Sequence, residues 1–125
     1  MLKKKYELEY IIRSSPGILY SRLGTPEGLE QWFADSVKLD EGMLTFTWGD
    51  DVQQAKIIDK KDNAYIRFQW IDEPEDNYFE FRIEIDDVTS EVALIITDFI
   101  FDDNIEEERQ LWDNQVNNLM HIIGS

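Results

Sequence analysis

The sequence contains no cysteine, and His121 is its single histidine among 125 residues. Without thiols the chain cannot form a disulfide framework, a thiolate nucleophile or a cysteine-ligated metal site. His121 falls in the last turn of a predicted helix, where the helix dipole favours a cationic side chain, so we interpret it as structural. We therefore predict no metal site and no cofactor.

Basic residues and long apolar runs are also scarce. Twelve Lys and Arg face 27 Asp and Glu, which gives a net charge of −15. Nucleic acids and anionic membranes attract clustered bases, so neither is an expected partner. The one basic run, residues 3–5, is interpreted as the solvated start of a strand. No apolar run approaches the roughly 20 residues of a membrane span, so we expect a cytoplasmic protein with no membrane insertion.

What the sequence does contain is a globular composition, with 42% hydrophobic and 13% aromatic residues. Its length predicts a single domain over residues 1–125. Residues 6–12 alternate as a half-buried strand. Ser15-Pro16 and Thr25-Pro26 each pair an N-cap residue with a proline, which predicts two short helices directly after this strand. Leu29, Trp32 and Phe33 are expected to line the second helix.

Six further strands are predicted between residues 37 and 100. Alternating or apolar segments at 37–39, 44–48, 52–58, 66–70, 79–85 and 92–100 are separated by Gly- and Asp-containing turns and by an acidic loop at 72–77. Such short connections favour antiparallel neighbours, so we expect a meander. One face of this sheet is apolar and the other is polar, so one face needs a cover.

The C-terminal residues 102–125 read as one long amphipathic helix. Its apolar stripe consists of Ile105, Trp112, Val116, Leu119, Met120 and Ile123. Asp103 and Glu106 resemble a capping box, and Gly124 supplies the stop. A helix of about 20 residues spans about 30 Å, enough to lie across the sheet. The predicted fold is α+β, a curved antiparallel sheet of about seven strands around this helix.

The element order and several local strings resemble a known family. These strings are TPEGLEQWFAD at 25–35, YFEFRI at 78–83, ITDF at 96–99, LWDNQ at 111–115 and IIGS at 122–125. The chain resembles the START-like, helix-grip (Bet v 1-like, SRPBCC) domains, in the branch of the activator of Hsp90 ATPase, and is similar to small single-domain START-like proteins of Bacteroidetes. The resemblance implies a pocket between sheet and helix, which relatives use for lipids, sterols, polyketides or hormones, while others act as protein-binding modules or co-chaperones. None of these strings is a catalytic signature.

The candidate site consists of the side chains expected to face that pocket. The predicted ligand-binding residues are Trp32, Phe33, Phe46, Trp48, Phe68, Trp70, Phe79, Phe81, Asp98, Trp112, Val116, Leu119, Met120 and Ile123. These aromatic rings either line an open pocket or fill the interior completely, and the sequence leaves both readings open. Asp98 points inward if Leu94 and Ile96 do, and an apolar cavity would then raise its pKa. Alternatively, the opposite face of the strand points inward, or Asp98 lies at the rim of the cavity in contact with solvent.

Three functional hypotheses follow. The first is non-catalytic binding of a small hydrophobic or amphipathic ligand under the last helix. The second is a protein-interaction or co-chaperone-like module acting through the acidic surface, as a monomer or a homodimer. The third is a cyclase- or dehydratase-type enzyme, for which Asp98 with Tyr10, Tyr20 or Tyr65 would supply the polar groups. We expect no catalytic residues under the first two.

Overall fold

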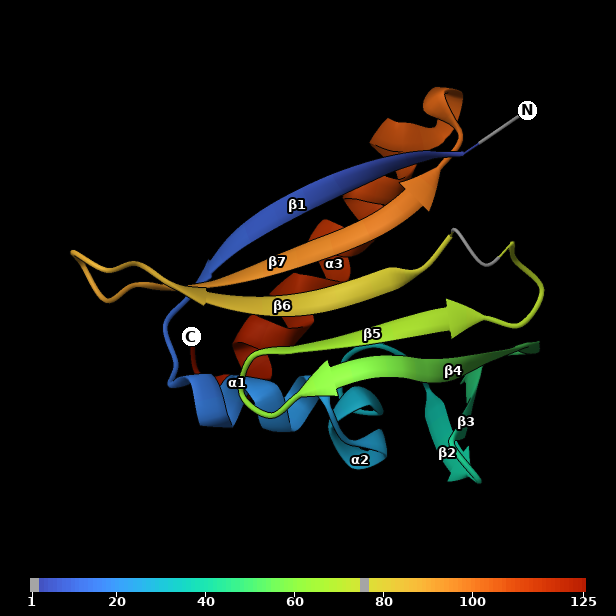
Figure 1. The fold of residues 1–125 in the computed structure, drawn as a ribbon, viewed down its shortest axis with the longest axis horizontal. Helices are drawn as coiled ribbons and strands as arrows, with labels where there is room; N and C mark the ends of the chain where they lie inside the picture. The colour runs from blue at the N-terminus through green and yellow to red at the C-terminus, as the bar shows by residue number, and fades with distance from the viewer. Residues whose placement is uncertain (1–2, 75–76) are drawn as a thin grey trace.

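The protein folds as a seven-stranded antiparallel sheet in the order β1-β7-β6-β5-β4-β3-β2, seen in a computed structural model that describes residues 3–74 and 77–125 (Figure 1). The strands are β1 (Lys4–Ile12), β2 (Ser36–Asp40), β3 (Met43–Trp48), β4 (Asp51–Lys61), β5 (Tyr65–Trp70), β6 (Phe79–Ile85) and β7 (Val92–Ile100). The predicted meander is confirmed, since β2 to β7 pair in sequence order and β1 closes against β7. Residues 75–76 of the predicted acidic loop lie outside the described residues.

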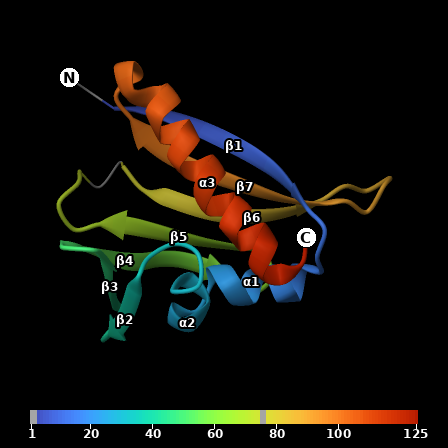
Figure 2. The same ribbon diagram turned by 180° about the vertical axis from the view of Figure 1, so that it is seen from behind.

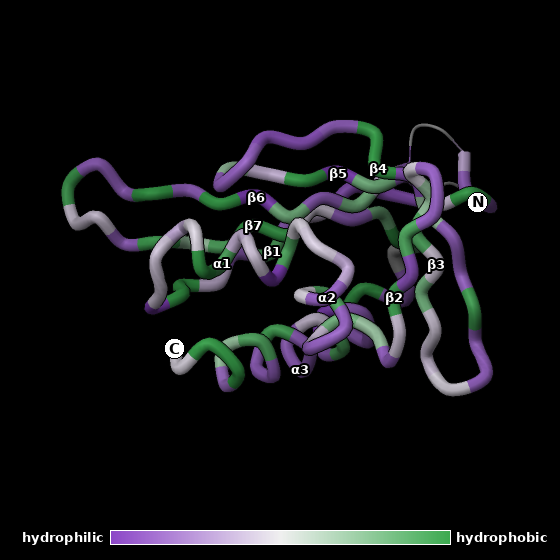
Figure 3. Tube along the Cα trace, turned by 90° about the horizontal axis from the view of Figure 1, so that it is seen from below, coloured by the Kyte–Doolittle hydropathy of each residue, from purple (hydrophilic) through white to green (hydrophobic). Residues whose placement is uncertain are grey.

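The long helix α3 (Ile105–Ile123) forms a second layer over one face of the sheet. Figure 2 shows it running diagonally in front of β1, β7 and β6, and Figure 3 shows the two layers edge-on. Tyr10 of β1 donates a hydrogen bond of 2.6 Å to Asp113, and Gln115 donates one of 3.0 Å to the carbonyl of Phe33. These bonds tie the helix to both the sheet and the segment after the second helix. The helix-grip architecture predicted from the sequence is therefore confirmed.

The two short helices begin where the sequence predicts. The Ser15 hydroxyl accepts the Ile18 amide at the start of α1 (Pro16–Leu23), and the Thr25 hydroxyl accepts the Gly28 amide at the start of α2 (Pro26–Leu29). The expected extent of α2 is wrong, because Trp32 lies in the turn that follows it. Several amides of this turn bond back to the Leu29 carbonyl, so the chain tightens there instead of continuing the helix.

The start of the C-terminal helix also differs from the prediction. Residues Asp102–Asn104 form a 3-10 turn, and α3 begins after Asn104, whose side chain makes no capping bond. The predicted capping box at Asp103 is therefore absent. Ile105 is 41% exposed and does not belong to the buried stripe, because the turn places it at the solvent side of the helix start. The end is as predicted, since Gly124 adopts a left-handed conformation with φ of 73°.

Strand β4 is longer than expected. The sequence predicts a strand over 52–58 and a turn from residue 59, yet β4 extends to Lys61. The register shifts between Ile57 and Asp59, which marks a bulge opposite β5. An extra residue at a bulge breaks the alternation on which the sequence prediction depends.

The interior between the sheet and the helices is filled by aromatic and aliphatic side chains. Phe46, Phe68 and Phe81 are fully buried, and Val116 and Leu119 of α3 reach the same core. The rings of Phe68 and Phe79 stack with centroids 4.5 Å apart. No helix of the described residues is long and apolar enough to cross a membrane.

Two glycines provide a matched test of packing between the short helices. A Cβ at Gly28 would collide with the Ser21 carbonyl oxygen and lie 2.6 Å from the Arg22 Cα, whereas a Cβ at Gly17 would meet only Asn63 Oδ1, at 3.9 Å. Gly28→Ala is expected to lower the free energy of unfolding by about 1–3 kcal/mol, because backbone must shift. Gly17→Ala should raise it by about 0.4–1 kcal/mol. Urea unfolding measures the change in stability of both variants. Equal changes in the free energy of unfolding for Gly28→Ala and Gly17→Ala would contradict the close approach of α1 and α2.

Candidate ligand-binding site

A cleft opens where β7 runs past its neighbour β6. The last β6–β7 pair at this end joins Glu80 to Thr97, while residues 98–100 continue along β1 alone. The gap between this end of β7, the β5–β6 connection and α3 as far as Asn118 holds a cleft of about 790 Å³. Its volume falls within the range of small-molecule sites, about 300–1,000 Å³.

Aromatic side chains form the apolar part of the cleft. Phe33, Trp48, Trp70 and Trp112 contribute to its wall, and Phe99 and Phe101 lie at the end of β7. Trp48 is held by a 2.6 Å hydrogen bond from its indole N–H to the Phe33 carbonyl. Trp70 stacks on Phe79 with centroids 4.7 Å apart. These contacts fix the rings before any ligand arrives, which lowers the entropic cost of binding.

Asp98 lies on the concave face, four and two residues beyond the buried Leu94 and Ile96, and lines the cleft. Its Oδ1 accepts the Phe99 amide at 2.8 Å, and the Tyr6 hydroxyl lies 3.4 Å from its Oδ2. The Trp112 indole N–H in turn donates to the Tyr6 hydroxyl at 3.0 Å. Strands β1 and β7 and helix α3 thus meet in one polar cluster beside the aromatic wall.

Burial raises the pKa of Asp98 to about 6. The Glu108 carboxylate adds to this increase, while the Phe99 amide, Trp112 and Lys3 act in the opposite direction. Burial likewise raises the pKa of Glu108 and that of Tyr6, so the Tyr6 phenol stays protonated. The cluster therefore holds two carboxylates that are costly to ionise next to a neutral hydroxyl.

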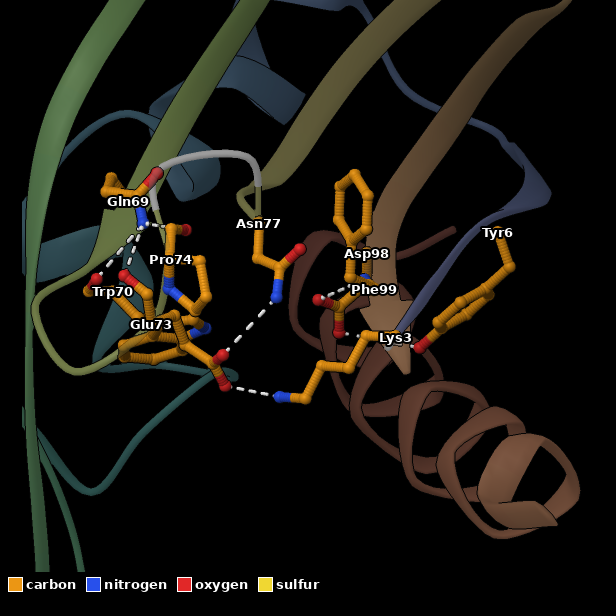
Figure 4. Close-up of polar contacts among 9 residues, drawn as sticks. All are labelled: Lys3, Tyr6, Gln69, Trp70, Glu73, Pro74, Asn77, Asp98 and Phe99. Carbon is orange, nitrogen blue, oxygen red and sulfur yellow. Dashed lines mark hydrogen bonds and ion pairs between the residues drawn. The ribbon is translucent and has the colours of Figure 1, made fainter. Parts of the chain in front are cut away.

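Lys3 spans the mouth of the cleft (Figure 4). Its ammonium forms an ion pair with Glu73 of the β5–β6 connection and lies 5.4 Å from the centre of the Phe101 ring. The Asn77 side chain also donates to Glu73, at 3.4 Å. Gln69 fixes the same connection by donating to the carbonyls of Trp70, Glu73 and Pro74. Lys3 is thus partly buried and paired, so its interpretation as a solvated residue is wrong.

The structure brings five of the predicted site residues to the cleft, namely Phe33, Trp48, Trp70, Asp98 and Trp112. It does not bring the other nine there: Trp32, Phe46, Phe68, Phe79, Phe81, Val116, Leu119, Met120 and Ile123 pack into the core or against it. The aromatic residues therefore divide between a cleft wall and a filled core, and ligand binding at the cleft stays a prediction. The interior is filled beneath α1 and α2 and open at the start of α3.

Several cleft residues were missed by the sequence reasoning. Glu108 and Gln115 stand four residues before and three after Trp112, so helical spacing places all three on one side of α3. Tyr6, which contacts the cleft residues Asp98 and Trp112, points to the same side of β1 as Leu8, and this alternation could have revealed it. Lys3 and Glu73 carry no signal of this kind, because their pairing depends on the tertiary arrangement.

The tyrosines nominated for an enzymatic role lie elsewhere. Tyr65 is on the opposite face of the sheet, under the Arg82 guanidinium at 4.4 Å, and Tyr20 approaches the Tyr65 carbonyl at 3.5 Å. Tyr10 bonds to Asp113, outside the cleft. Within the described ranges, no three His, Asp or Glu side chains group as metal ligands. A smaller hollow of about 330 Å³ on the convex face is bordered mainly by charged side chains of β1 and β6.

The whole chain matches a family model. The model of the START-like superfamily domain matches residues 1–125. The chain belongs to the START-like superfamily. The family resemblance stated from the sequence is thus confirmed, and it extends over the elements that build the cleft.

Solved structures agree with this assignment. The START-like chain is similar to BfR322 from Bacteroides fragilis, with 39% identity, 98% and 92% of the two chains covered and a TM-score of 0.69. It is also similar in fold to the Aha1 dimer from Colwellia psychrerythraea, with 17% identity, 96% of each chain covered and a TM-score of 0.80. MLL2253 from Mesorhizobium loti shares 13% identity, with 97% of each chain covered and a TM-score of 0.80. A comparison with proteins of curated function gave no match.

Proposed function

We propose that this START-like protein binds a small amphipathic molecule, without catalysis, in the cleft at the start of α3. The observation that carries the proposal is the cleft itself, about 790 Å³ of space with an aromatic wall that includes Trp48, Trp70 and Trp112. Aromatic faces bind hydrocarbon, while Asp98, Glu108 and the amide side chains of α3 supply polar contacts at its edge. A ligand with an apolar body and a polar end matches both parts.

Native mass spectrometry of protein purified from its own host tests this proposal. A small molecule that remains bound, and is released when the protein is denatured, is the expected result. A mass equal to that of the bare chain, together with no binding of any amphipathic probe, would overturn the proposal.

A cleft-filling variant gives a sharper test. Leu111 lines the cleft yet is 57% exposed, so Leu111→Trp should fill space there without disturbing the core. Loss of the apolar contact area is expected to weaken ligand binding by about tenfold or more. Ile122→Trp is the matched control, since Ile122 is an aliphatic residue on the same helix, 38% exposed and away from the cleft. Equal binding by the two variants in calorimetry would place the ligand elsewhere.

A protein-interaction module is the second candidate. Strand β2 is an edge of the sheet and carries Leu39, which is 50% exposed, so it offers a surface for a second copy. A similar fold occurs as a dimer in the Aha1 structure from Colwellia psychrerythraea. Sedimentation at increasing protein concentration distinguishes this homodimer from a monomer.

A basic partner held by the net charge of −15 would instead dissociate as salt is added.

A further inference from the structure

We propose that the ligand of the cleft is a cation, an organic ammonium whose charged group lies toward Asp98 and Glu108 and whose apolar part lies on the aromatic wall. This inference rests on the proposed function and adds the charge of the ligand to it. Four carboxylates, those of Asp51, Glu73, Asp98 and Glu108, line the cleft among the described residues, against the single ammonium of Lys3.

Burial distinguishes two of these carboxylates from the many acids of the surface. With 27 acidic residues in 125, carboxylates are common everywhere on this chain, so their number alone points to nothing. Asp98 and Glu108, however, are partly buried, and the Glu108 carboxylate is close enough to oppose ionisation of Asp98. A bound cation would relieve that repulsion, and its attraction to these carboxylates exceeds that to fully exposed ones because partial burial reduces screening by water.

Lys3 already shows how an ammonium is accommodated at the mouth of this cleft. Its charge lies between the Glu73 carboxylate and the face of the Phe101 ring, 5.4 Å away. Lys3 pairs with Glu73 and also favours ionisation of Asp98 and Glu108, so its one positive charge faces four carboxylates and the cleft keeps an excess of negative charge for a ligand. Trp112 lies beside Asp98 and Glu108 in the cleft, with its indole N–H directed at the Tyr6 hydroxyl.

The aromatic wall strengthens the preference for a cation. Tryptophan faces attract cations more strongly than other rings, by about 0.5–2 kcal/mol depending on desolvation. Trp48, Trp70 and Trp112 all line the cleft. An anionic amphiphile such as a fatty carboxylate would bring its charge against these two partly buried carboxylates, and a neutral alcohol would gain at most a hydrogen bond from them.

Three probes with the same eight-carbon chain test the inference: octyltrimethylammonium, 1-octanol and octyl sulfate. Titration calorimetry at pH 7.5 should show the ammonium binding about tenfold more tightly than octanol, with octyl sulfate the weakest. Tryptophan fluorescence should change on saturation, because three of the four tryptophans line the cleft. Octanol or octyl sulfate binding as tightly as the ammonium would overturn the inference.

A matched pair of variants separates the cleft from the general acidity of the protein. Glu108→Gln removes a cleft carboxylate, and Glu106→Gln removes an exposed one two residues away on the same helix. The ammonium should bind about fivefold more weakly to Glu108→Gln and as before to Glu106→Gln, while octanol binds both equally. Asp98→Asn should weaken ammonium binding in the same way. Equal losses in the Glu108 and Glu106 variants would overturn the inference.

The pH dependence of binding gives an independent readout. The groups facing Asp98 are Tyr6 and Lys3 from β1 and its N-terminal side, and Glu108 and Trp112 from α3. Since Asp98 ionises near pH 6, the affinity for the permanently charged ammonium should rise between pH 5 and 7.5 in the wild type and rise less in Asp98→Asn. Tight octanol or octyl sulfate binding with no ammonium preference would refute the cation and leave the proposed function standing. Absence of binding by all three probes would count against both.

Discussion

Replacing Phe81 with alanine is expected to lower the free energy of unfolding by about 3–5 kcal/mol. Phe81 is fully buried on β6 at the point where sheet, turn and helix meet. Its ring lies 5.3 Å from that of Trp32 and 5.9 Å from that of Trp112, measured between centroids. Phe33, Phe68 and Phe79 also surround it within 6 Å. Large rigid rings cannot move far into the space that Phe81 leaves, so a cavity remains.

Urea denaturation of the Phe81→Ala protein measures this loss, and an unchanged dependence on urea would show that the unfolded state is unaffected. Val88→Ala is the control, because Val88 is 91% exposed and its truncation should change stability by less than about 0.5 kcal/mol. A loss below about 1.5 kcal/mol in Phe81→Ala would mean that the surrounding rings close the gap, contrary to the packing described above. Phe81 does not line the cleft, so residual folded protein should still bind ligand.

Asp98→Asn is expected to stabilise the protein at pH 7.5, by up to about 3 kcal/mol. Burial, as the main cause, raises the pKa of Asp98 from 3.8 to about 6 in the folded protein. The folded state therefore holds a proton that the unfolded state has released between about pH 4 and 6, so stability falls as the pH rises through this window. Above pH 6 the ionised Asp98 lowers the free energy of unfolding by about 1.4 kcal/mol for each unit by which its pKa differs between the folded and unfolded states. Asparagine keeps the shape and the acceptor for the Phe99 amide but carries no charge.

Thermal and urea unfolding at pH 4 and at pH 7.5 check this prediction. The higher stability of the Asp98→Asn protein should be present at pH 7.5 and nearly absent at pH 4, where Asp98 is protonated in the folded wild type. Glu106→Gln removes an exposed carboxylate of the same charge and should change stability little at either pH. A destabilised Asp98→Asn protein at pH 7.5 would show that the charged form is favoured by its neighbours and that Asp98 is not costly to ionise.

The Asp98 prediction connects stability with the proposed ligand. Functional sites commonly contain carboxylates whose desolvation lowers the stability of the folded protein, because the same groups bind a ligand. An organic cation beside Asp98 would stabilise the ionised form and lower its pKa toward the ordinary value. The same variant that gains stability should then lose affinity for the ammonium probe.

Most of the fold could be predicted from local patterns. Ser15-Pro16 and Thr25-Pro26 begin helices because their hydroxyls can accept the first free amides of a helix, a property that needs no tertiary contact. Strand β6 alternates between apolar and charged residues, and this alternation predicted that Phe79, Phe81 and Ile83 would be buried. It did not predict that Glu80, on the other face, would be buried as well. Glu80 is only 5% exposed because Arg67 and Arg82 cover it on the convex face.

The sequence by itself determined the order of helices and strands and the apolar face of the sheet, because period-two and helical spacing are local properties of the chain, and its resemblance to START-like domains named the fold. It left the direction of Asp98 open, and the tertiary structure placed this side chain at the cleft. Only the tertiary structure decided which aromatic side chains surround a cleft and which fill the core. That outcome depends on where β7 extends beyond β6 and on where α3 begins after its 3-10 turn. It likewise brought Lys3 to Glu73, 70 positions apart in the chain. Pairings of this kind depend on the distance between strand ends, which no local pattern of residues encodes.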